Sequence, residues 1–177
     1  MSGLRERLLE RIAWVDGHAD VWRTFWDAEF FPQLVAALAD PLRARGLDRV
    51  AGIEGRGFIL GAPVAVELGA GFVAIRKDAG LFPGHKLTRV TPPDYRGNTT
   101  TLRLQAGSVT PGDRVALVDD WFETGSQALT ARALLGQAGA VFVGASVIVD
   151  QLADDVREAI GGVSALIPAA ALGDGGS

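Results

Sequence analysis

Cysteine is absent from this 177-residue sequence, so disulfide bonds and thiolate metal sites are excluded and a reducing cytoplasm is compatible with it. An excess of positive charge is also missing, because 17 Lys and Arg residues stand against 21 Asp and Glu residues and give a net charge of −4. This balance provides no general attraction to nucleic acid or to anionic lipid. An anionic ligand would therefore have to be held by groups placed locally around it.

Long uncharged hydrophobic runs are missing as well. No such run reaches the length of a membrane-spanning helix, and charges interrupt residues 1–11, which excludes the apolar core of a signal peptide. We therefore expect a cytoplasmic protein without membrane or nucleic-acid partners. With 48% hydrophobic and 21% charged residues, the chain has the composition of one ordinary globular domain.

Short apolar runs alternate with helical patterns along most of the chain. Continuous apolar runs are typical of strands that are covered on both faces, and their alternation with helices predicts right-handed crossovers in a parallel sheet. The expected strands are 49–53, 71–75, 114–118, 141–149 and 164–167, and the expected helices are 3–13, 29–45, 58–68, 126–138 and 152–160. The predicted fold class is α/β, a single-domain, mostly parallel twisted sheet flanked by helices.

Residues 78–100 break this alternation with a polar stretch rich in Gly and Pro. A connection of this length inside a compact domain is usually a functional lid or disordered. We interpret residues 78–100 as a flexible lid loop within a domain of residues 1–172, followed by a disordered tail over 173–177. A linker between two domains is the alternative, but the alternation resumes directly after the stretch.

Two adjacent carboxylates, Asp119 and Asp120, follow the expected strand 114–118. They would be costly to desolvate unless they met hydrogen-bond donors or a cation. The carboxyl end of a strand is where ligands bind in open α/β sheets. The two hydroxyls of a ribose are donors spaced to satisfy such a pair.

A turn into a helix comes next and carries Thr124, Gly125, Ser126 and Gln127. The first backbone N–H groups of a helix are unpaired and its dipole favours an anion, so this turn suits a phosphate. Together with the carboxylates it describes a ribose 5-phosphate site. The alternative is an Asp-rich strand end with Thr124 as a helix N-cap.

This run resembles the type I phosphoribosyltransferases, whose fingerprint is an apolar strand, two acidic residues, a short variable stretch and then Thr-Gly before a helix. The match lies at Asp119, Asp120, Thr124 and Gly125, whereas Gln127 stands where the family usually has Thr or Ser. The resemblance implies that residues 119–127 bind the ribose and 5-phosphate of 5-phosphoribosyl-1-pyrophosphate (PRPP).

A second resemblance, to adenine phosphoribosyltransferases, begins at residues 51–63 and extends to the expected lid. It implies a pyrophosphate pocket in which glycines let the backbone approach an anion and cations balance its charge. The residues implied are Gly55, Arg56, Gly57, Arg76 and Lys77.

A dinucleotide-binding turn is the alternative for the glycines, because Gly55, Gly57 and Gly61 follow a strand and Asp78 follows the next one. That alternative leaves residues 119–125 unexplained.

The family closes a lid bearing a Glu-Tyr pair over the reacting centre, and Asp94-Tyr95 occupies the corresponding place. The resemblance implies a catalytic role for both residues, although Asp has a shorter reach than Glu. A solvated turn after Pro92-Pro93 is the alternative.

Aromatic residues are the candidates for binding the base, because a flat base stacks on an aromatic ring. The family's Phe-Arg-Asp segment appears here as Trp-Arg-Thr, and two aromatic residues follow the acidic pair where the family usually has aliphatic ones. The candidates are Trp22, Arg23, Trp121 and Phe122. Ordinary core packing is the alternative, above all for Trp14 and Trp26.

Glu123 precedes Thr124, where adenine enzymes tend to have Ala. The hypothesis is that Glu123 hydrogen-bonds the base or acts as its general acid or base, and outward solvation is the alternative.

The activity implied is transfer of the 5-phosphoribosyl group from PRPP to a purine base with release of pyrophosphate. The resemblance also implies a homodimer and Mg²⁺ held by the substrate's oxygens and water, with Asp119 and Asp120 reaching it through water only. Direct protein metal ligands are not expected. Two alternatives remain open: a PRPP-binding regulator of the same fold without turnover, and an enzyme for a 6-oxopurine or another base.

Overall fold

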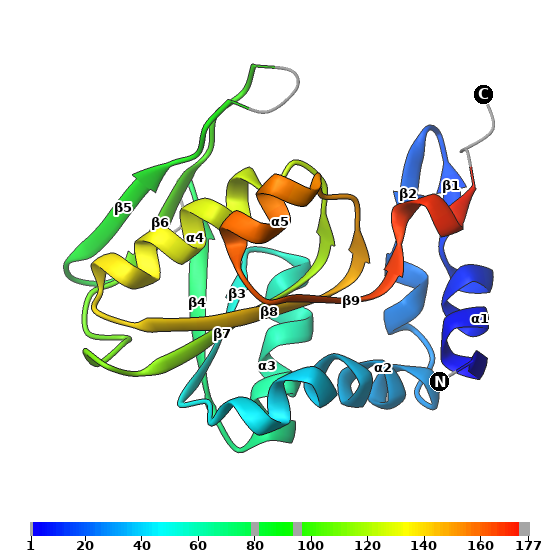
Figure 1. Ribbon diagram of the computed structural model, residues 1–177, viewed down its shortest axis with the longest axis horizontal. Helices are drawn as coiled ribbons and strands as arrows, with labels where there is room; N and C mark the ends of the chain where they lie inside the picture. Colours follow the sequence, from blue (N-terminus) through cyan, green and yellow to red (C-terminus); the bar gives the residue numbers. More distant parts are fainter. Residues whose placement is uncertain (1, 79–81, 94–96, 174–177) are drawn as a thin grey trace.

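The computed structural model describes residues 2–78, 82–93 and 97–173. Within these residues a seven-stranded sheet has the order β5-β6-β4-β3-β7-β8-β9 (Figure 1). Its strands are β3 Arg49–Ile53, β4 Gly71–Lys77, β5 Lys86–Val90, β6 Thr101–Gln105, β7 Arg114–Phe122, β8 Val141–Asp150 and β9 Val163–Pro168. The five adjacent strands β4-β3-β7-β8-β9 are parallel, whereas β6 pairs antiparallel with both β4 and β5.

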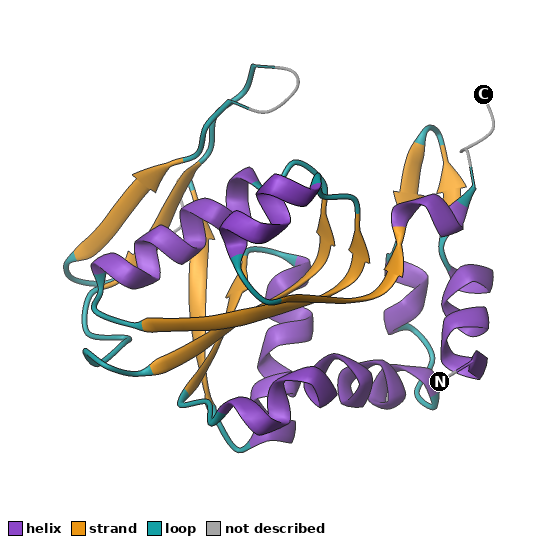
Figure 2. Ribbon diagram, in the orientation of Figure 1, coloured by secondary structure: helices purple, strands orange, loops and turns teal. Residues whose placement is uncertain are grey.

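Helices cover both faces of this sheet (Figure 2). Helices α2 and α3 pack on one face with α1 beside them, and α4 and α5 pack on the other. The helices are α1 Ser2–Arg11, α2 Phe30–Ala39, α3 Arg56–Leu68, α4 Ser126–Gln137 and α5 Asp154–Ile160, with short 3₁₀ helices at Trp22–Phe25, Asp40–Arg45 and Ala169–Leu172. Among the described residues, no helix has both the length and the hydrophobicity needed to cross a bilayer.

The central strands send alternate side chains into two separate cores, because successive residues of a strand point to opposite faces. On β7, Ala116 and Val118 face the core under α2 and α3, while Leu117 faces the core under α4. All three are fully buried, which explains why these strands are apolar without interruption. Each buried side chain as large as Leu117 contributes about 1.5–3 kcal/mol relative to an exposed one.

The predicted fold class is confirmed, and each strand expected from the sequence is present. The expected helix 29–45 ends earlier, because α2 stops at Ala39 and a 3₁₀ helix over Asp40–Arg45 follows. Pro41 near the start of that segment has no N–H to donate, so the α-helical ladder cannot pass through it. Gly46 then closes the segment in a left-handed conformation at φ 58°.

The segment predicted as a lid loop contains regular structure. Residues 86–90 form β5, which pairs with β6 so that Leu87 lies opposite Leu104. The prediction that residues 78–100 form one loop is therefore wrong for β5. Gly and Pro at both ends of the segment concealed a short strand whose apolar side, at Leu87, is only partly buried.

A small hairpin near the N-terminus was not expected at all. Strands β1 Ala13–Val15 and β2 His18–Asp20 pair antiparallel around Asp16 and Gly17. Both turn residues have positive φ, 49° and 74°, which is the geometry that an Asp-Gly hairpin turn requires. The dipeptide was a readable hairpin signal, but each strand has only three residues.

Candidate active site

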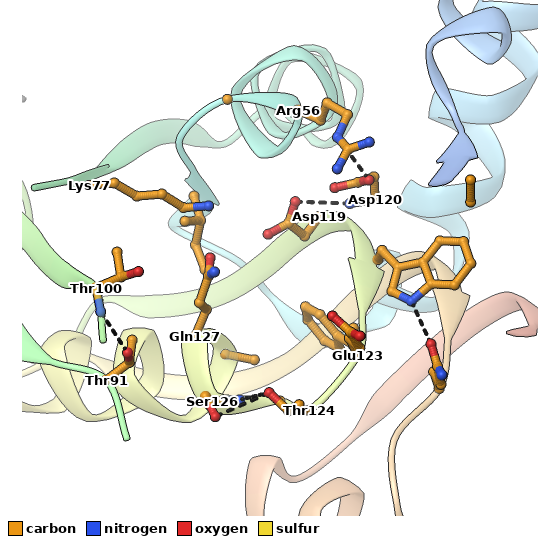
Figure 3. Close-up of a pocket in the computed structure, with 18 of the residues that line it drawn as sticks. Arg56, Lys77, Thr91, Thr100, Asp119, Asp120, Glu123, Thr124, Ser126 and Gln127 are labelled. Carbon is orange, nitrogen blue, oxygen red and sulfur yellow. Dashed lines mark hydrogen bonds and ion pairs between the residues drawn. The ribbon is translucent and has the colours of Figure 1, made fainter. Parts of the chain in front are cut away.

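A cavity of about 740 Å³ opens where β3, β4, β7 and β8 end, at the carboxyl edge of the sheet (Figure 3). This edge is where ligands bind in open α/β folds. Its walls come from segments far apart in the sequence. The lining residues are Trp14, Gly17, His18, Ala19, Trp22, Ile53, Glu54, Gly55, Arg56, Lys77, Thr91, Pro92, Asn98, Thr100, Asp119, Asp120, Trp121, Phe122, Glu123, Thr124, Gly125, Ser126, Gln127, Ala128 and Gln151.

The acidic pair lies in the last part of β7, which continues to Phe122 instead of ending before the carboxylates. Asp120 is 5% exposed, and its Oδ2 lies 3.0 Å from Nε of Arg56. Asp119 Oδ1 accepts a hydrogen bond of 2.9 Å from the backbone N–H of Asp120. Both carboxylates line the cavity, as the sequence predicts, so neither is turned into the apolar core.

Asp119 is the more unfavourably placed of the two acids. Burial raises the pKa of its carboxyl well above the usual value, and the negative charge of Asp120 adds to the effect, while Lys77 opposes it. Asp120, in contrast, has Arg56 against it in an ion pair. A ligand that brings hydroxyl donors or positive charge to Asp119 would relieve this strain on the charged form.

The turn after β7 has the geometry of an anion site. Gly125 is left-handed at φ 74° and α4 begins directly after it, so the first N–H groups of α4 face the cavity that the turn lines. Thr124 Oγ1 lies 3.1 Å from Ser126 Oγ and accepts from the Ser126 N–H at 3.4 Å. Figure 3 shows Gln127 extending from the same helix end toward the cavity.

Helix α5 supports this turn from behind. A Cβ added to Gly125 would lie 2.5 Å from Val156 Cγ1 and 2.9 Å from Leu152 Cδ2. The loop before α5 is held by Asp150, whose Oδ1 accepts from the Leu152 N–H at 2.8 Å and whose Oδ2 lies 2.9 Å from Nη2 of Arg157. The position of the phosphate turn therefore depends on an element that the motif does not contain.

The residues expected to bind pyrophosphate separate into two groups. Gly55, Arg56 and Lys77 line the cavity. Arg76 is outside the lining and pairs with Glu54 at 2.7 Å, because adjacent residues of β4 point to opposite faces. Hydrogen bonds from Arg76 and from the Lys77 N–H lower the pKa of Glu54.

Gly57 also lies outside the lining. Its missing Cβ would be 3.1 Å from Asp119 Oδ1 and 3.3 Å from the Val118 carbonyl oxygen. This glycine allows the first turn of α3 to pack directly against β7 beside the acidic pair. Gly57 thus contacts the acidic pair and not the part of the cavity lined by Gly55, Arg56 and Lys77.

Three of the four candidates for base binding line the cavity: Trp22, Trp121 and Phe122. The fourth, Arg23, is outside the lining and pairs with Asp20 at 3.6 Å. Arg56 also lies over the Trp22 ring, with its guanidinium carbon 5.8 Å from the ring centre.

The core alternative is wrong for Trp14 and Trp26, which are 40% and 72% exposed. Trp14 lines the cavity and meets Trp121 edge to face, with ring centres 6.5 Å apart and planes at 73°. Exposed Glu123 lies between Trp121 and the phosphate turn along the same lining. Asp94 and Tyr95, the predicted catalytic pair of the lid, lie outside the described residues.

Sequence reasoning missed the wall formed where the loop between β5 and β6 begins and ends. Thr91 and Thr100 are joined there by two hydrogen bonds, from the Thr91 N–H to the Thr100 carbonyl at 2.9 Å and from the Thr100 N–H to Thr91 Oγ1 at 3.0 Å. Asn98 and Gln151 line the cavity as well. Within residues 2–78, 82–93 and 97–173, no group of three or more His, Asp or Glu residues is arranged to hold a metal ion.

An acidic pair at the end of a parallel strand, with a glycine-led helix start in the same cavity, is the arrangement of a type I phosphoribosyltransferase. The chain is 39% identical to an adenine phosphoribosyltransferase of Streptomyces clavuligerus over 84% of its own length and 86% of the relative. It is 46% identical to that of Thermobifida fusca over 66% of its length and 64% of the relative. The chain belongs to the adenine phosphoribosyltransferase family.

Solved structures agree with this assignment. The crystal structure of adenine phosphoribosyltransferase from Rhodothermus marinus matches with a TM-score of 0.82 and 28% identity, covering 95% of this chain and 99% of the other. No family model matches the sequence.

Proposed function

We propose that this protein transfers the 5-phosphoribosyl group of PRPP to adenine, forming AMP and pyrophosphate. The observation that carries the proposal is that the acidic pair Asp119-Asp120 and the start of α4 face one cavity. A ribose 5-phosphate satisfies both at once, because its hydroxyls are donors and its phosphate is an anion. The choice of adenine as the base, and of phosphoribosyl transfer as the reaction, follows from the adenine phosphoribosyltransferases named above.

Each part of PRPP has a complementary part of the cavity. The ribose hydroxyls donate to Asp119 and Asp120, and the 5-phosphate lies against the N–H groups and hydroxyls of residues 124–127. Arg56 and Lys77 balance the charge of the pyrophosphate. Arg56 already contacts Asp120 at 3.0 Å, so this cation lies next to both the ribose and the leaving group.

Catalysis rests on holding the two reactants in line and stabilising the charge that develops between them. As the bond to pyrophosphate lengthens, positive charge grows on the ribose beside Asp119 and Asp120. Mg²⁺, when bound, would neutralise part of the negative charge of the pyrophosphate. The exposed carboxylate of Glu123, beside Trp121, is placed to accept a proton from the base. Closure by Asp94 and Tyr95 stays a prediction.

The acidic pair fits a hydrated Mg²⁺ ion. Burial and mutual repulsion make the charged form of Asp119 unfavourable, and a nearby cation would offset both effects. Mg²⁺ usually keeps several waters and takes few protein ligands, which suits two carboxylates acting through water. The homodimer, which rests on the family resemblance, and the cytoplasmic location, with which the lack of cysteine is compatible, are further parts of this proposal.

The test is release of pyrophosphate from PRPP and Mg²⁺ in the presence of adenine, hypoxanthine, guanine or a pyrimidine. We expect turnover with adenine. Binding of PRPP without turnover of any base would favour the regulator, and turnover restricted to hypoxanthine and guanine would favour the 6-oxopurine enzyme. Arg43→Ala is a suitable control, because Arg43 makes an exposed ion pair with Glu67 away from the cavity.

A further inference from the structure

Gln151 is the first residue after β8 and lines the cavity. It lies outside the sequence motif of residues 119–127. Its backbone N–H donates to the Phe122 carbonyl at 2.9 Å, which fixes it beside the end of β7. Its side-chain Oε1 accepts a hydrogen bond of 3.1 Å from Nε1 of Trp121. This exposed residue is thus anchored next to the aromatic wall by its backbone and by its side-chain oxygen.

The partner of Oε1 determines which way the amide faces. The indole nitrogen of Trp121 is a donor only, so it must meet the amide oxygen and not the amide nitrogen. The Nε2 group of Gln151, with two N–H donors, is then turned away from the indole. Nε2 makes no hydrogen bond to any residue of the described chain, so both donors remain for a ligand or for water.

Trp121 is held from two sides, by Gln151 and by the edge-to-face contact with Trp14. A ring held in this way is a rigid platform for a flat base. Adenine stacked on the Trp121 ring would present its edge to groups that surround the ring, and the Gln151 amide is one of them. A donor in that place pairs with a ring nitrogen, because the ring nitrogens of adenine other than the reacting one are acceptors.

We propose that Gln151 takes part in recognition of the base: its oxygen holds Trp121 in place and its Nε2 donates a hydrogen bond to a ring nitrogen of the bound base. The proposal rests on the proposed function and specifies how the base is recognised. Glu123, proposed above to take the proton of the reacting ring nitrogen, lines the same wall, so the base meets an acceptor at that nitrogen and the Gln151 donor at another ring nitrogen.

Three variants separate the two roles of Gln151. Gln151→Glu keeps an oxygen for the Trp121 N–H but loses the Nε2 donors, whereas Gln151→Leu loses both functions. Trp121→Phe keeps an aromatic platform but removes the bond that orients the amide. Gln33→Leu is the matched control, because Gln33 lies on α2 outside the cavity.

We expect Gln151→Glu and Gln151→Leu to lower kcat/KM for adenine by roughly tenfold or more, since an acceptor on the base is left without a partner. The KM for PRPP should stay within about threefold of wild type, because the hydrogen bond concerned is made to the base. Trp121→Phe should give a smaller loss, and Gln33→Leu none.

Adenine analogues in which one ring nitrogen is replaced by carbon identify the contact. With 1-deaza-, 3-deaza- and 7-deazaadenine, one analogue should be penalised in the wild type and lose that penalty in Gln151→Leu. If Gln151→Glu and Gln151→Leu keep the wild-type kcat/KM for adenine, or if no analogue penalty changes, the proposal is overturned while the proposed function stands. A wild type that turns over no base overturns both.

Discussion

Replacing Gly125 by Ala tests whether the phosphate turn and α5 are packed as tightly as the structure shows. The new Cβ would lie 2.5 Å from Val156 Cγ1 and 2.9 Å from Leu152 Cδ2, both nearer than real Cβ contacts allow. The left-handed φ of 74° adds about 1–2 kcal/mol for a residue with a Cβ. Overpacking of this kind costs about 1–3 kcal/mol. Together these effects predict a loss of about 2–5 kcal/mol in the free energy of unfolding.

The same substitution should weaken PRPP binding. Either α5 moves outward or the turn moves into the cavity, and in both cases the N–H groups at the start of α4 shift relative to the phosphate. Loss of one or two hydrogen bonds to a charged phosphate predicts a rise of at least about tenfold in the Kd for PRPP. The KM for adenine should change less, because the turn does not form the aromatic wall.

Urea unfolding and PRPP titration measure the two effects. The control is Gly136→Ala in the same helix, where a Cβ would meet nothing within 4 Å. That variant should be more stable than wild type by about 0.5–1 kcal/mol, because Ala loses less backbone entropy than Gly in a helix. A Gly125→Ala protein with wild-type stability and PRPP affinity would refute the reasoning about the turn.

Three further outcomes follow from the charges. The pKa of Asp119 is higher in the folded protein than in the unfolded chain, so the ionised carboxylate lowers stability once the pH is above the pKa of the unfolded chain. Asp119→Asn should therefore raise the Tm at pH 7 to 8. The same variant should lower kcat/KM by about 10- to 100-fold, because hydrogen bonds to the charged carboxylate are lost. Arg11 lowers the pKa of Asp27 to about 2, so the stabilisation by Asp27 is lost as pH falls from 4 toward 2, and the Tm difference between wild type and Asp27→Asn should vanish near pH 2. Asp150→Asn removes a charge from the ion pair with Arg157, and we expect urea unfolding to show a loss of about 1–3 kcal/mol and kinetics to show a higher KM for PRPP.

The parts of the site that were predicted from the sequence are those contained in one short segment. Residues 119–127 join the strand end, the turn and the helix start, so their chemistry can be read without knowing the fold. The fold class was equally accessible, because fully covered strands are apolar at every position. Asp119, Asp120 and the start of α4 lie in one cavity as predicted.

The parts that were missed depend on pairing between distant segments. Thr91 and Thr100 reach the cavity only because β5 and β6 form a hairpin, and Trp14 reaches it only because β1 and β2 do. Gln151 gives no signal in the sequence, since a lone Gln after an apolar strand is an ordinary loop residue. Its importance appears only when its amide is found against Trp121.

Strand alternation explains the arrangement of charges better than the motifs do. Lys77 follows Ile75 on the α4 side of the sheet, and Asp119 follows Leu117 on that side, so the lysine opposes the rise in the pKa of Asp119. Asp120 follows Val118 on the other side, where Arg56 begins α3 and pairs with it. Each adjacent acid therefore has its own cation, Lys77 for Asp119 and Arg56 for Asp120, while Gly57 at the start of α3 lies against the Asp119 carboxylate. A ligand in the cavity can therefore contact both acids and both cations at the same edge of the sheet.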